Sequence, residues 1–388
     1  MKPLARAVLV AALIAMVWSS PTHRVPARAA TPAAATSALY AVAARSSGDV
    51  WAVGTKGYPS AGAPSYIFVA HWDGTRWRDV SPVLGCTREM AADVGLGALC
   101  AAAPKRGLSA TLMGVAALSN GEVWAVGSKL GLVLHWDGSR WQVAWWDQAW
   151  NTLPQDVGAV AAVSPRDVWA TGDRAATPPR PGLEALVEHW DGVRWQTVPV
   201  SGTSVLGVAA LSRRDVWAVG SGDQGGLIEH WDGVRWRVVY EPGPHRVCCS
   251  GIAALARDDV WAAGGSLAPN PNVALHWDGR HWQSLVLPVV KDSLLWTLTA
   301  ISAYDVWAVG TVNASTHPKT LIEHWDGVRW RVVPSPNVAG HANFLFGVAG
   351  VSARDVWAVG RVGGYDSDAT SKALIEHWDG VRWSIVPS

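Results

Sequence analysis

The hydrophobic and polar positions of the chain follow one repeating pattern, which is clearest between residues 204 and 242. An apolar run, Leu206–Leu211, leads through a polar turn into a second run, Asp215–Val219. Two further runs, Leu227–Trp231 and Arg235–Val239, flank an Asp-Gly pair. β-Branched and aromatic residues fill the runs while Gly, Asp and Pro separate them, so the pattern predicts four short strands, A to D. The runs are almost continuously apolar, which is typical of strands covered on both faces.

The two short turns of this unit carry their own signals. Ser212-Arg213-Arg214 joins strands A and B, and we expect the Asp that opens strand B to cap this turn. Asp232-Gly233 joins strands C and D. We expect it to form a type I′ turn, in which both central residues have positive φ.

Two motifs repeat this unit along the chain and alternate strictly. The first, D/E-V-W-A-x-G, has its Trp at Trp51, Trp124, Trp169, Trp217, Trp261, Trp307 and Trp357. The second, H-W-D-G-x-x-W, has its His at His71, His135, His189, His230, His276, His324 and His377. Successive first motifs lie 44 to 50 residues apart, except for one step of 73. This period suits a four-stranded propeller blade, so we predict an all-β, seven-bladed propeller with four antiparallel strands per blade.

The motifs also resemble those of a known repeat. Val216-Trp-Ala-Val-Gly220, followed by Glu229-His-Trp-Asp-Gly-Val-Arg-Trp236, is similar to a kelch repeat, with a strand that ends in glycine and an aromatic-Asp turn before a Trp. The resemblance covers about residues 37–388 and implies a kelch-like propeller. The kelch double glycine is single here except at Gly264-Gly265, and Trp-Asp-Gly stands where kelch repeats have Tyr-Asp-Pro. The galactose-oxidase type of propeller chemistry is not expected, because its Tyr–Cys cofactor and copper ligands have no matching motif.

The copies set the expected domain organisation. Residues 1–29 are predicted to be a signal peptide and 30–36 a lead-in, followed by one propeller domain over 37–388. The blades are expected at about 37–85, 112–150, 157–200, 204–242, 249–288, 294–336 and 343–388, with a Cys-bounded insertion at 86–111. Strand A of the first copy and strand D of the last are both present. The ring is therefore expected to close without a blade shared between the two ends of the chain.

The first residues indicate export. Lys2 and Arg6 flank the start of an apolar run that ends at Trp18, and Ala27-Arg28-Ala29 fits an A-x-A cleavage site. The run is shorter than the roughly 20 residues that span a bilayer. We expect a secreted or extracytoplasmic protein without a membrane span after cleavage, with an uncleaved anchor as the alternative.

Charge and tryptophan content narrow the picture further. The net charge is +1, and cleavage after Ala29 would remove four basic and no acidic residues, which leaves −3. This argues against nucleic-acid binding. Arginines recur singly in the C–D hairpins, where we expect them to support strands and Trp rings rather than bind anions. Of the 26 Trp residues, 21 belong to the repeat, so most of them are expected to be architectural.

Four cysteines occur in this exported chain. Cys86 and Cys100 could close the long insertion, and a cross-link from this loop to that of Cys248 and Cys249 is the alternative. A bond between the adjacent Cys248 and Cys249 is unfavourable, because neighbouring Cα atoms lie about 3.8 Å apart and disulfides prefer at least 4.4 Å. No C-x-x-C pair suggests a metal site.

No catalytic constellation stands out. The seven recurrent His residues are expected to be core residues bonded to a neighbouring Asp or to backbone, because a single active site needs no sevenfold copy. G-x-S-x-G is absent, and Asp366 and Asp368 lack the Gly and Glu of an EF-hand loop. We therefore expect neither a metal nor another cofactor.

All length variation between copies falls on one face of the expected ring. The spacing from the Trp of strand B to the His of strand C varies from 11 to 20 residues, and the D–A connections vary more, whereas the A–B and C–D turns are uniform. Variable loops on a rigid scaffold usually carry binding. The candidate ligand-binding residues in or beside these connections are Trp145, Trp146, Trp150, Tyr240, His245, Trp296 and His341.

The predicted function is a monomeric, non-enzymatic binding module for a protein or glycan. One alternative is a propeller hydrolase or lyase that acts on polysaccharide at the mouth of the channel. The other is a structural envelope protein. Two acidic residues facing each other about 5–10 Å apart would favour the glycosidase, and exposed aromatic residues without them would favour binding.

Overall fold

The computed structural model describes residues 36–57, 66–82, 110–128, 131–145, 155–176, 182–223, 225–243, 249–265, 272–363 and 371–387. These residues form strands and turns, with no helix among them. A membrane-spanning helix is accordingly not found in the described part of the chain. Of the four cysteines, Cys249 is described and is buried, while Cys86, Cys100 and Cys248 lie outside the described residues.

Twenty-eight strands make up the described structure. Those of the first four blades are β1 (Thr36–Ser46), β2 (Asp49–Gly57), β3 (Tyr66–Trp72), β4 (Trp77–Asp79), β5 (Thr111–Ala117), β6 (Val123–Ser128), β7 (Leu132–Trp136), β8 (Trp141–Trp145), β9 (Gln155–Ser164), β10 (Asp167–Ala175), β11 (Leu183–Trp190), β12 (Trp195–Thr197), β13 (Ser204–Ser212), β14 (Asp215–Gly222), β15 (Gly225–Trp231) and β16 (Trp236–Tyr240). Those of the last three are β17 (Gly251–Ala256), β18 (Asp259–Gly264), β19 (Val273–Trp277), β20 (Trp282–Leu285), β21 (Ser293–Ser302), β22 (Asp305–Val312), β23 (Lys319–Trp325), β24 (Trp330–Val332), β25 (Ala342–Ser352), β26 (Asp355–Gly363), β27 (Lys372–Trp378) and β28 (Trp383–Ile385).

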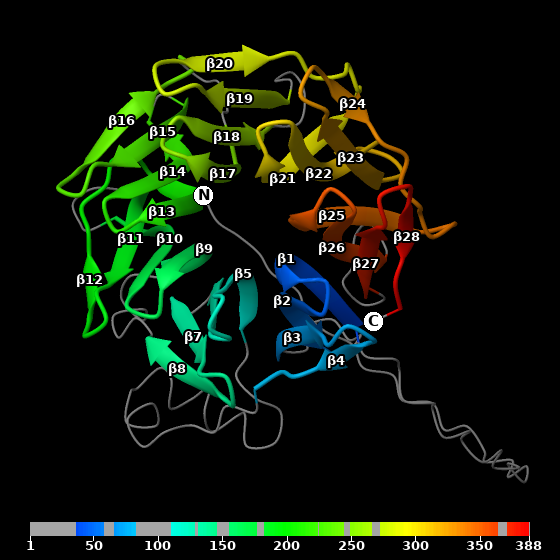
Figure 1. Ribbon diagram of the computed structural model, residues 1–388, viewed down its shortest axis with the longest axis horizontal. Coiled ribbons are helices and arrows are strands. Elements are labelled where there is room, and N and C mark those ends of the chain that lie inside the picture. Colours follow the sequence, from blue (N-terminus) through cyan, green and yellow to red (C-terminus); the bar gives the residue numbers. More distant parts are fainter. Residues whose placement is uncertain are drawn as a thin grey trace, which may run out of the picture. The chain divides into compact units, whose positions relative to one another are not determined.

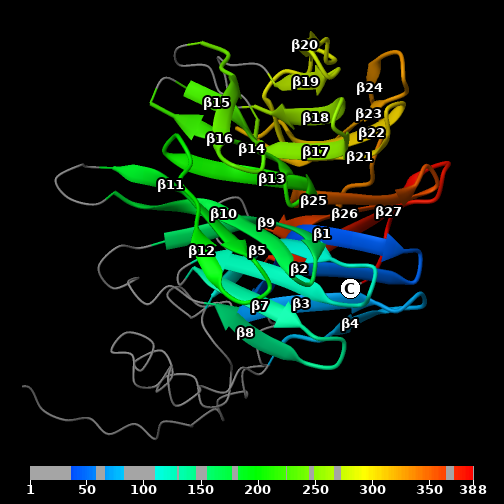
Figure 2. The same cartoon turned by 60° about the vertical axis from the view of Figure 1, so that its left-hand side comes forward.

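The strands form seven antiparallel sheets of four, and each sheet is continuous in the chain. The sheets follow one another as the blades of a propeller around a central opening (Figure 1), with β1, β5, β9, β13, β17, β21 and β25 innermost. Figure 2 shows the blades from the side. The seven-bladed fold predicted from the repeat is therefore confirmed. The first and last blades meet directly, because β1 packs against β25 and the amide of Ser37 donates to the carbonyl of Ser371 at 2.9 Å.

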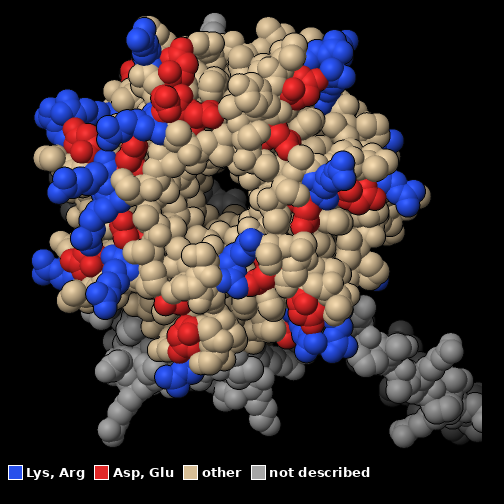
Figure 3. All heavy atoms as spheres, viewed as in Figure 1, with Lys and Arg blue, Asp and Glu red and all other residues tan. Residues whose placement is uncertain are grey.

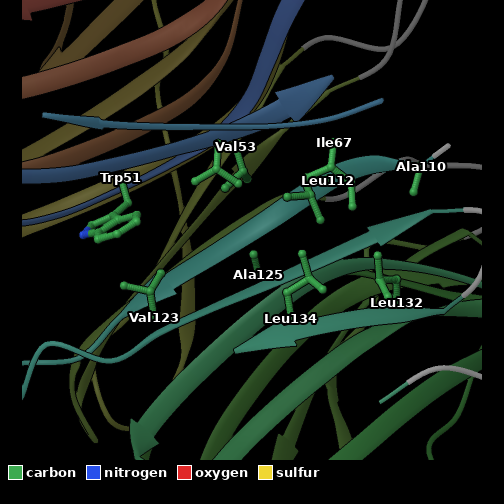
Figure 4. Packing of buried hydrophobic residues seen from close by; sticks show 10 residues of the cluster. Trp51, Val53, Ile67, Ala110, Leu112, Val123, Ala125, Leu132 and Leu134 are labelled. Atoms are coloured by element: carbon green, nitrogen blue, oxygen red, sulfur yellow. The ribbon is translucent and has the colours of Figure 1, made fainter. Parts of the chain in front are cut away.

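Tryptophan residues join every pair of neighbouring blades in the same way. The strand-B Trp of one blade meets the strand-D Trp of the next edge to face, with ring centroids 5.5–6.4 Å apart. At the closure of the ring, Trp357 meets Trp77 at 5.5 Å and Trp72 at 5.2 Å. Aliphatic side chains fill the rest of each interface, as Figure 4 shows for the first two blades, where Val53 and Leu112 pack together. The repeated Trp residues thus form the core between blades.

The A–B and C–D turns lie together on one side of the ring, which we call the turn face. The Gly233 turn of the fourth blade packs against Arg214 of the A–B turn, and the indole N–H of Trp231 donates to the carbonyl of Arg213 at 3.1 Å. In an antiparallel blade the B–C loops and D–A connections must then lie on the opposite side, which we call the loop face.

The C–D turn differs from the predicted type I′ turn. Trp231 pairs with Trp236, so four residues form the loop, and Gly233 has φ of 92° while Asp232 is not among the residues with positive φ. Oδ1 of Asp232 accepts the amides of Val234 and Arg235 at 2.9 and 3.0 Å, which holds the loop without a left-handed Asp. These two amides and the Arg237 guanidinium lower the pKa of Asp232 to about 2.

The Asp that opens strand B does not cap the A–B turn, contrary to expectation. The Ser before that turn fills this role, since Oγ of Ser212 accepts the amide of Arg214 at 3.3 Å. The carboxylate of Asp215 instead accepts the indole N–H of Trp217 at 3.1 Å.

Candidate functional site at the channel mouth

In six blades a β-bulge in the innermost strand projects one residue into the central channel, and in the fifth blade Ser250, directly before β17, takes the equivalent place. In β21, for example, Leu295 pairs with Gly310 and Thr297 with Val309, so that Trp296 is the extra residue. A bulge of this kind leaves one residue unpaired and re-aims its side chain. The positions that result, which we call the collar, are Tyr40, Met113, Gly158, Leu206, Ser250, Trp296 and Phe346.

The collar is large and apolar on one side and small on the other. Trp296 of the sixth blade meets Phe346 of the seventh edge to face at 5.8 Å, and Phe346 meets Tyr40 of the first blade at 5.4 Å. These three rings form a continuous aromatic arc over adjacent blades. The third and fifth blades supply only Gly158 and Ser250.

Two carboxylates stand at the third blade, which the blade order places across the channel from the arc. Asp156 of β9 pairs with Asp173 of β10, so their side chains project from the same side of the sheet. Oδ2 of Asp173 accepts the hydroxyl of Ser204 at 2.8 Å. Burial is the largest cause that raises the pKa of Asp173, and the nearby Asp156 raises it further. We call these two residues the acid pair.

Collar and acid pair line one cavity of about 540 Å³ inside the ring. Asp156 and Asp173 are the only charged residues among the described ones that line it. Strand A starts from the D–A connection, and Asp156 lies near this start, two residues before Gly158. This part of the channel therefore opens toward the loop face. Figure 3 shows the opening through the ring, bordered mainly by uncharged residues, with charged side chains concentrated farther out.

A second cavity, of about 830 Å³, lies between the outer parts of the third and fourth blades. Glycines and the polar residues Arg174, Glu184, Asp223 and Glu241 form much of its wall. Arg174 and Glu184 pair with each other at 2.5 Å. No aromatic residue is found among the described residues that line this groove, so it is a weaker candidate than the channel mouth.

Only some of the predicted ligand-binding residues reach a free surface. Trp145 and Tyr240 end the outer strands β8 and β16, where they are half-buried. Their rings pack on the strand-D Trp of the following blade, with centroids 6.3 Å from Trp195 and 6.2 Å from Trp282, respectively. Both residues therefore contribute to packing between blades.

Trp296 and His341 are exposed. Trp296 is 39% exposed and belongs to the collar, whereas His341 lies in the connection that leads into β25. Trp146, Trp150 and His245 lie outside the described residues. Of the predicted set, the structure thus places Trp296 in the channel.

The seven recurrent His residues form a uniform element within the blades. Nε2 of His230 donates to Oδ1 of Asp215 at 2.8 Å, and the imidazole lies over Trp217 with centroids 4.3 Å apart. Every blade has this contact between His and carboxylate, at 2.8–3.0 Å, with Glu122 in place of Asp in the second blade. Burial is the largest cause that lowers the pKa of His71, which keeps this ring neutral at neutral pH.

Sequence analysis overlooked several buried carboxylates. Glu229, Glu323 and Glu376 precede the His of strand C and are almost completely buried. Burial raises their pKa to about 7, 7 and 8, respectively. The E-H-W triplet was the available signal, because a Glu inside a run of core residues must be buried with its neighbours. Elsewhere in the described residues, no three His, Cys, Asp or Glu side chains are grouped as a metal site requires.

Comparisons with solved structures find the same fold at low sequence identity. The chain is similar to YCF48 bound to D1 peptide, with a TM-score of 0.53, 13% identity, and coverage of 90% of this chain and 97% of that one. It is also similar to an inactive variant of virginiamycin B lyase from Staphylococcus aureus with quinupristin, with a TM-score of 0.55, 10% identity, and coverage of 88% of this chain and 95% of that one. For the RRP9 WD40 repeats the TM-score is 0.54, the identity is 12%, and the coverage is 83% of this chain and 87% of that one. No protein-family model and no curated protein matches the sequence. At these identities the likeness is one of fold.

Proposed function

We propose that this protein is a secreted, monomeric, kelch-like propeller that binds a protein or glycan without catalysis, at the channel mouth on its loop face. The observation that carries the proposal is the collar. The blades share the Trp, His and Gly positions of the repeat, yet at the collar each blade presents a different side chain. Leu206 and Trp296 are 45% and 39% exposed there, although they lie on rigid inner strands.

Exposed apolar groups in a concave site favour binding. Large aromatic side chains dominate the energy of recognition because they bury much apolar area while losing few rotamers. The cavity size of about 540 Å³ lies within the range of ligand pockets. Because strands rather than loops hold the aromatic arc, a ligand would meet it already in place, at a small entropic cost.

The acid pair is the feature that an enzyme would need, and its placement favours binding instead. Glycosidase carboxylates flank the scissile bond. Asp156 and Asp173 are cross-strand neighbours in one blade, so a sugar would meet both from the same side. The fold itself does not decide between binding and catalysis. The similar propellers include YCF48, which is bound to a peptide, and virginiamycin B lyase, which is an enzyme.

A comparison of two double variants tests the proposal. Trp296→Ala with Phe346→Ala removes the aromatic arc, while Val234→Ser with Val381→Ser alters two turn-face residues that are each 81% exposed. Partners are recovered with the mature protein from culture medium and from a glycan array. We expect the arc variant to lose them and the turn-face variant to keep them. The opposite pattern would place binding on the turn face and refute the proposal.

Export is part of the same proposal and has its own test. The apolar run before Ala29 and the A-x-A site support cleavage there. N-terminal sequencing of protein recovered from the medium should begin at residue 30. A protein that stays in the cytosol with Met1 in place would contradict export.

A further inference from the structure

We propose that the channel mouth takes a peptide segment in which a basic side chain is flanked by apolar or aromatic side chains. This inference rests on the proposed function and deepens it by assigning the chemistry of the ligand. It starts from the asymmetry of the cavity, with three touching aromatic rings on the blades of Tyr40, Trp296 and Phe346 and two carboxylates on the blade opposite.

Charge complementarity selects a cationic ligand. Asp156 and Asp173 are both acidic, and no Lys or Arg is found among the described residues that line the cavity. Two carboxylates on paired strands repel each other, and a cation between them would remove this repulsion. Gly158 beside them carries no side chain, and even an added Cβ would meet nothing within 4 Å, which leaves room for a guanidinium or ammonium group.

The aromatic arc selects the rest of the ligand. Rings of Trp, Tyr and Phe bind apolar side chains and also attract cations through their faces. Met113 and Leu206, which are 37% and 45% exposed, extend the apolar surface on both sides of the acid pair. A neutral glycan could stack on the arc but would bring no positive charge to the acidic wall, and an acidic glycan or peptide would be repelled by it. A basic, partly apolar peptide can place its positive charge against the acid pair and its apolar side chains against the aromatic arc.

Calorimetric titration of three blocked pentapeptides, with Phe-Arg-Phe, Phe-Gln-Phe or Phe-Glu-Phe at their centres, tests this inference on the full mature chain. Hydrogen bonds to charged groups are worth about 1.5–3 kcal/mol, so we expect the Arg peptide to bind at least about tenfold more tightly than the Gln peptide. Asp156→Asn with Asp173→Asn should abolish this difference by weakening the binding of the Arg peptide. The control, Asp223→Asn with Glu241→Gln, removes two acids from the outer groove and should change neither affinity.

The outcomes separate this inference from the proposed function. Equal binding of the Arg and Gln peptides, an acid-pair variant that keeps the preference for Arg, or no heat with the Arg peptide at about millimolar concentration would overturn the inference. If the Glu peptide or cellohexaose binds and only the Trp296→Ala, Phe346→Ala variant loses it, the channel mouth is the binding site for a different chemistry. If binding of every probe survives loss of the aromatic arc, the proposed site itself is wrong.

Discussion

At the scale of single residues, the recurrent His belongs to one contact with a carboxylate that is repeated in every blade. Its ring packs against the strand-B Trp, and its Nε2 is hydrogen-bonded to a carboxylate. In six of the blades this carboxylate also accepts the indole N–H of the Trp. The Trp and carboxylate of strand B are thus connected to the His of strand C, although a long B–C loop separates the two strands in some blades. The contact between His and carboxylate therefore places a polar link within the sheet of every blade.

Removing this link should reduce stability without changing binding. In His230→Ala, Asp215 loses its imidazole partner and keeps a buried carboxylate, which typically costs about 1–3 kcal/mol. The measurement is the free energy of unfolding in urea. His281→Ala, which removes an exposed imidazole from a C–D turn, serves as the control and should change it by less than about 0.5 kcal/mol. A His230→Ala protein of normal stability that no longer binds its partner would show that the His has a functional role.

The buried Glu residues should make stability decrease with rising pH. Glu376 is fully buried and its pKa is raised from 4.5 to about 8. Below pH 4.5 the carboxyl is protonated in both the folded and the unfolded chain. Between pH 4.5 and 8 the unfolded chain releases the proton while the folded chain retains it, so the free energy of unfolding falls as pH rises.

Glu376→Gln should remove the part of this dependence that Glu376 contributes, while Glu229 and Glu323 keep theirs. The variant keeps the shape of the protonated side chain, so its stability should match that of wild type near pH 4.5. Near pH 9 it should exceed wild type by on the order of 4 kcal/mol. Urea unfolding at both pH values measures the difference, and the exposed Glu241→Gln is the control. Parallel pH profiles for wild type and Glu376→Gln would contradict the assignment of a buried, protonated Glu.

At the scale of elements, the glycine that ends strand B and the bulge in strand A depend on each other. A Cβ on Gly220 would lie 2.0 Å from the carbonyl oxygen of Ser204, and one on Gly360 would lie 1.8 Å from that of Phe344. The backbone of strand A, bent by its bulge, thus comes too close for any other residue. The repeated glycine of the motif makes the collar possible.

Gly220→Ala should therefore be strongly destabilising, because backbone atoms rather than a flexible side chain stand in the way. We expect a loss of at least about 2 kcal/mol, as found for other overpacked or strained sites. Gly158→Ala is the matched control, since its Cβ would meet nothing within 4 Å and its φ is not positive. Thermal unfolding of both variants measures the effect. Equal melting temperatures would contradict the close backbone approach.

The strands were predictable and the bulges were not. In the fourth blade the predicted strands agree with β13 to β16 within three residues at each end, because β-branched runs and Gly or Asp breaks mark them directly. A bulge leaves no separate mark, since Leu206 reads as one more core residue of its strand. The available hint was a large side chain followed by Gly, as at Met113-Gly114 and Phe346-Gly347. The prediction of a type I′ turn between strands C and D was wrong. The Asp side chain holds this turn, and the Asp itself does not have the positive φ that a type I′ turn requires.

At the scale of the whole molecule, the interfaces between blades are uniform, whereas the residues of the collar around the channel differ from blade to blade. All seven interfaces use the same Trp contacts, and the closure between the last and first blades is no exception, with Trp357 against Trp77. Sequence analysis predicted this architecture and the face that would vary. It identified only Trp296 of the collar, because the acid pair and the other collar residues come together through seven separate blades.

The most direct test of the binding face is photo-crosslinking from inside and outside the channel mouth. p-Benzoylphenylalanine replaces Trp296 in one protein and the turn-face residue Val234 in another, and each mature protein is irradiated in culture medium. We expect that a partner is covalently captured from position 296, that excess Phe-Arg-Phe peptide suppresses this capture, and that position 234 captures none. Capture from position 234 alone, or none from position 296, would contradict binding at the channel mouth.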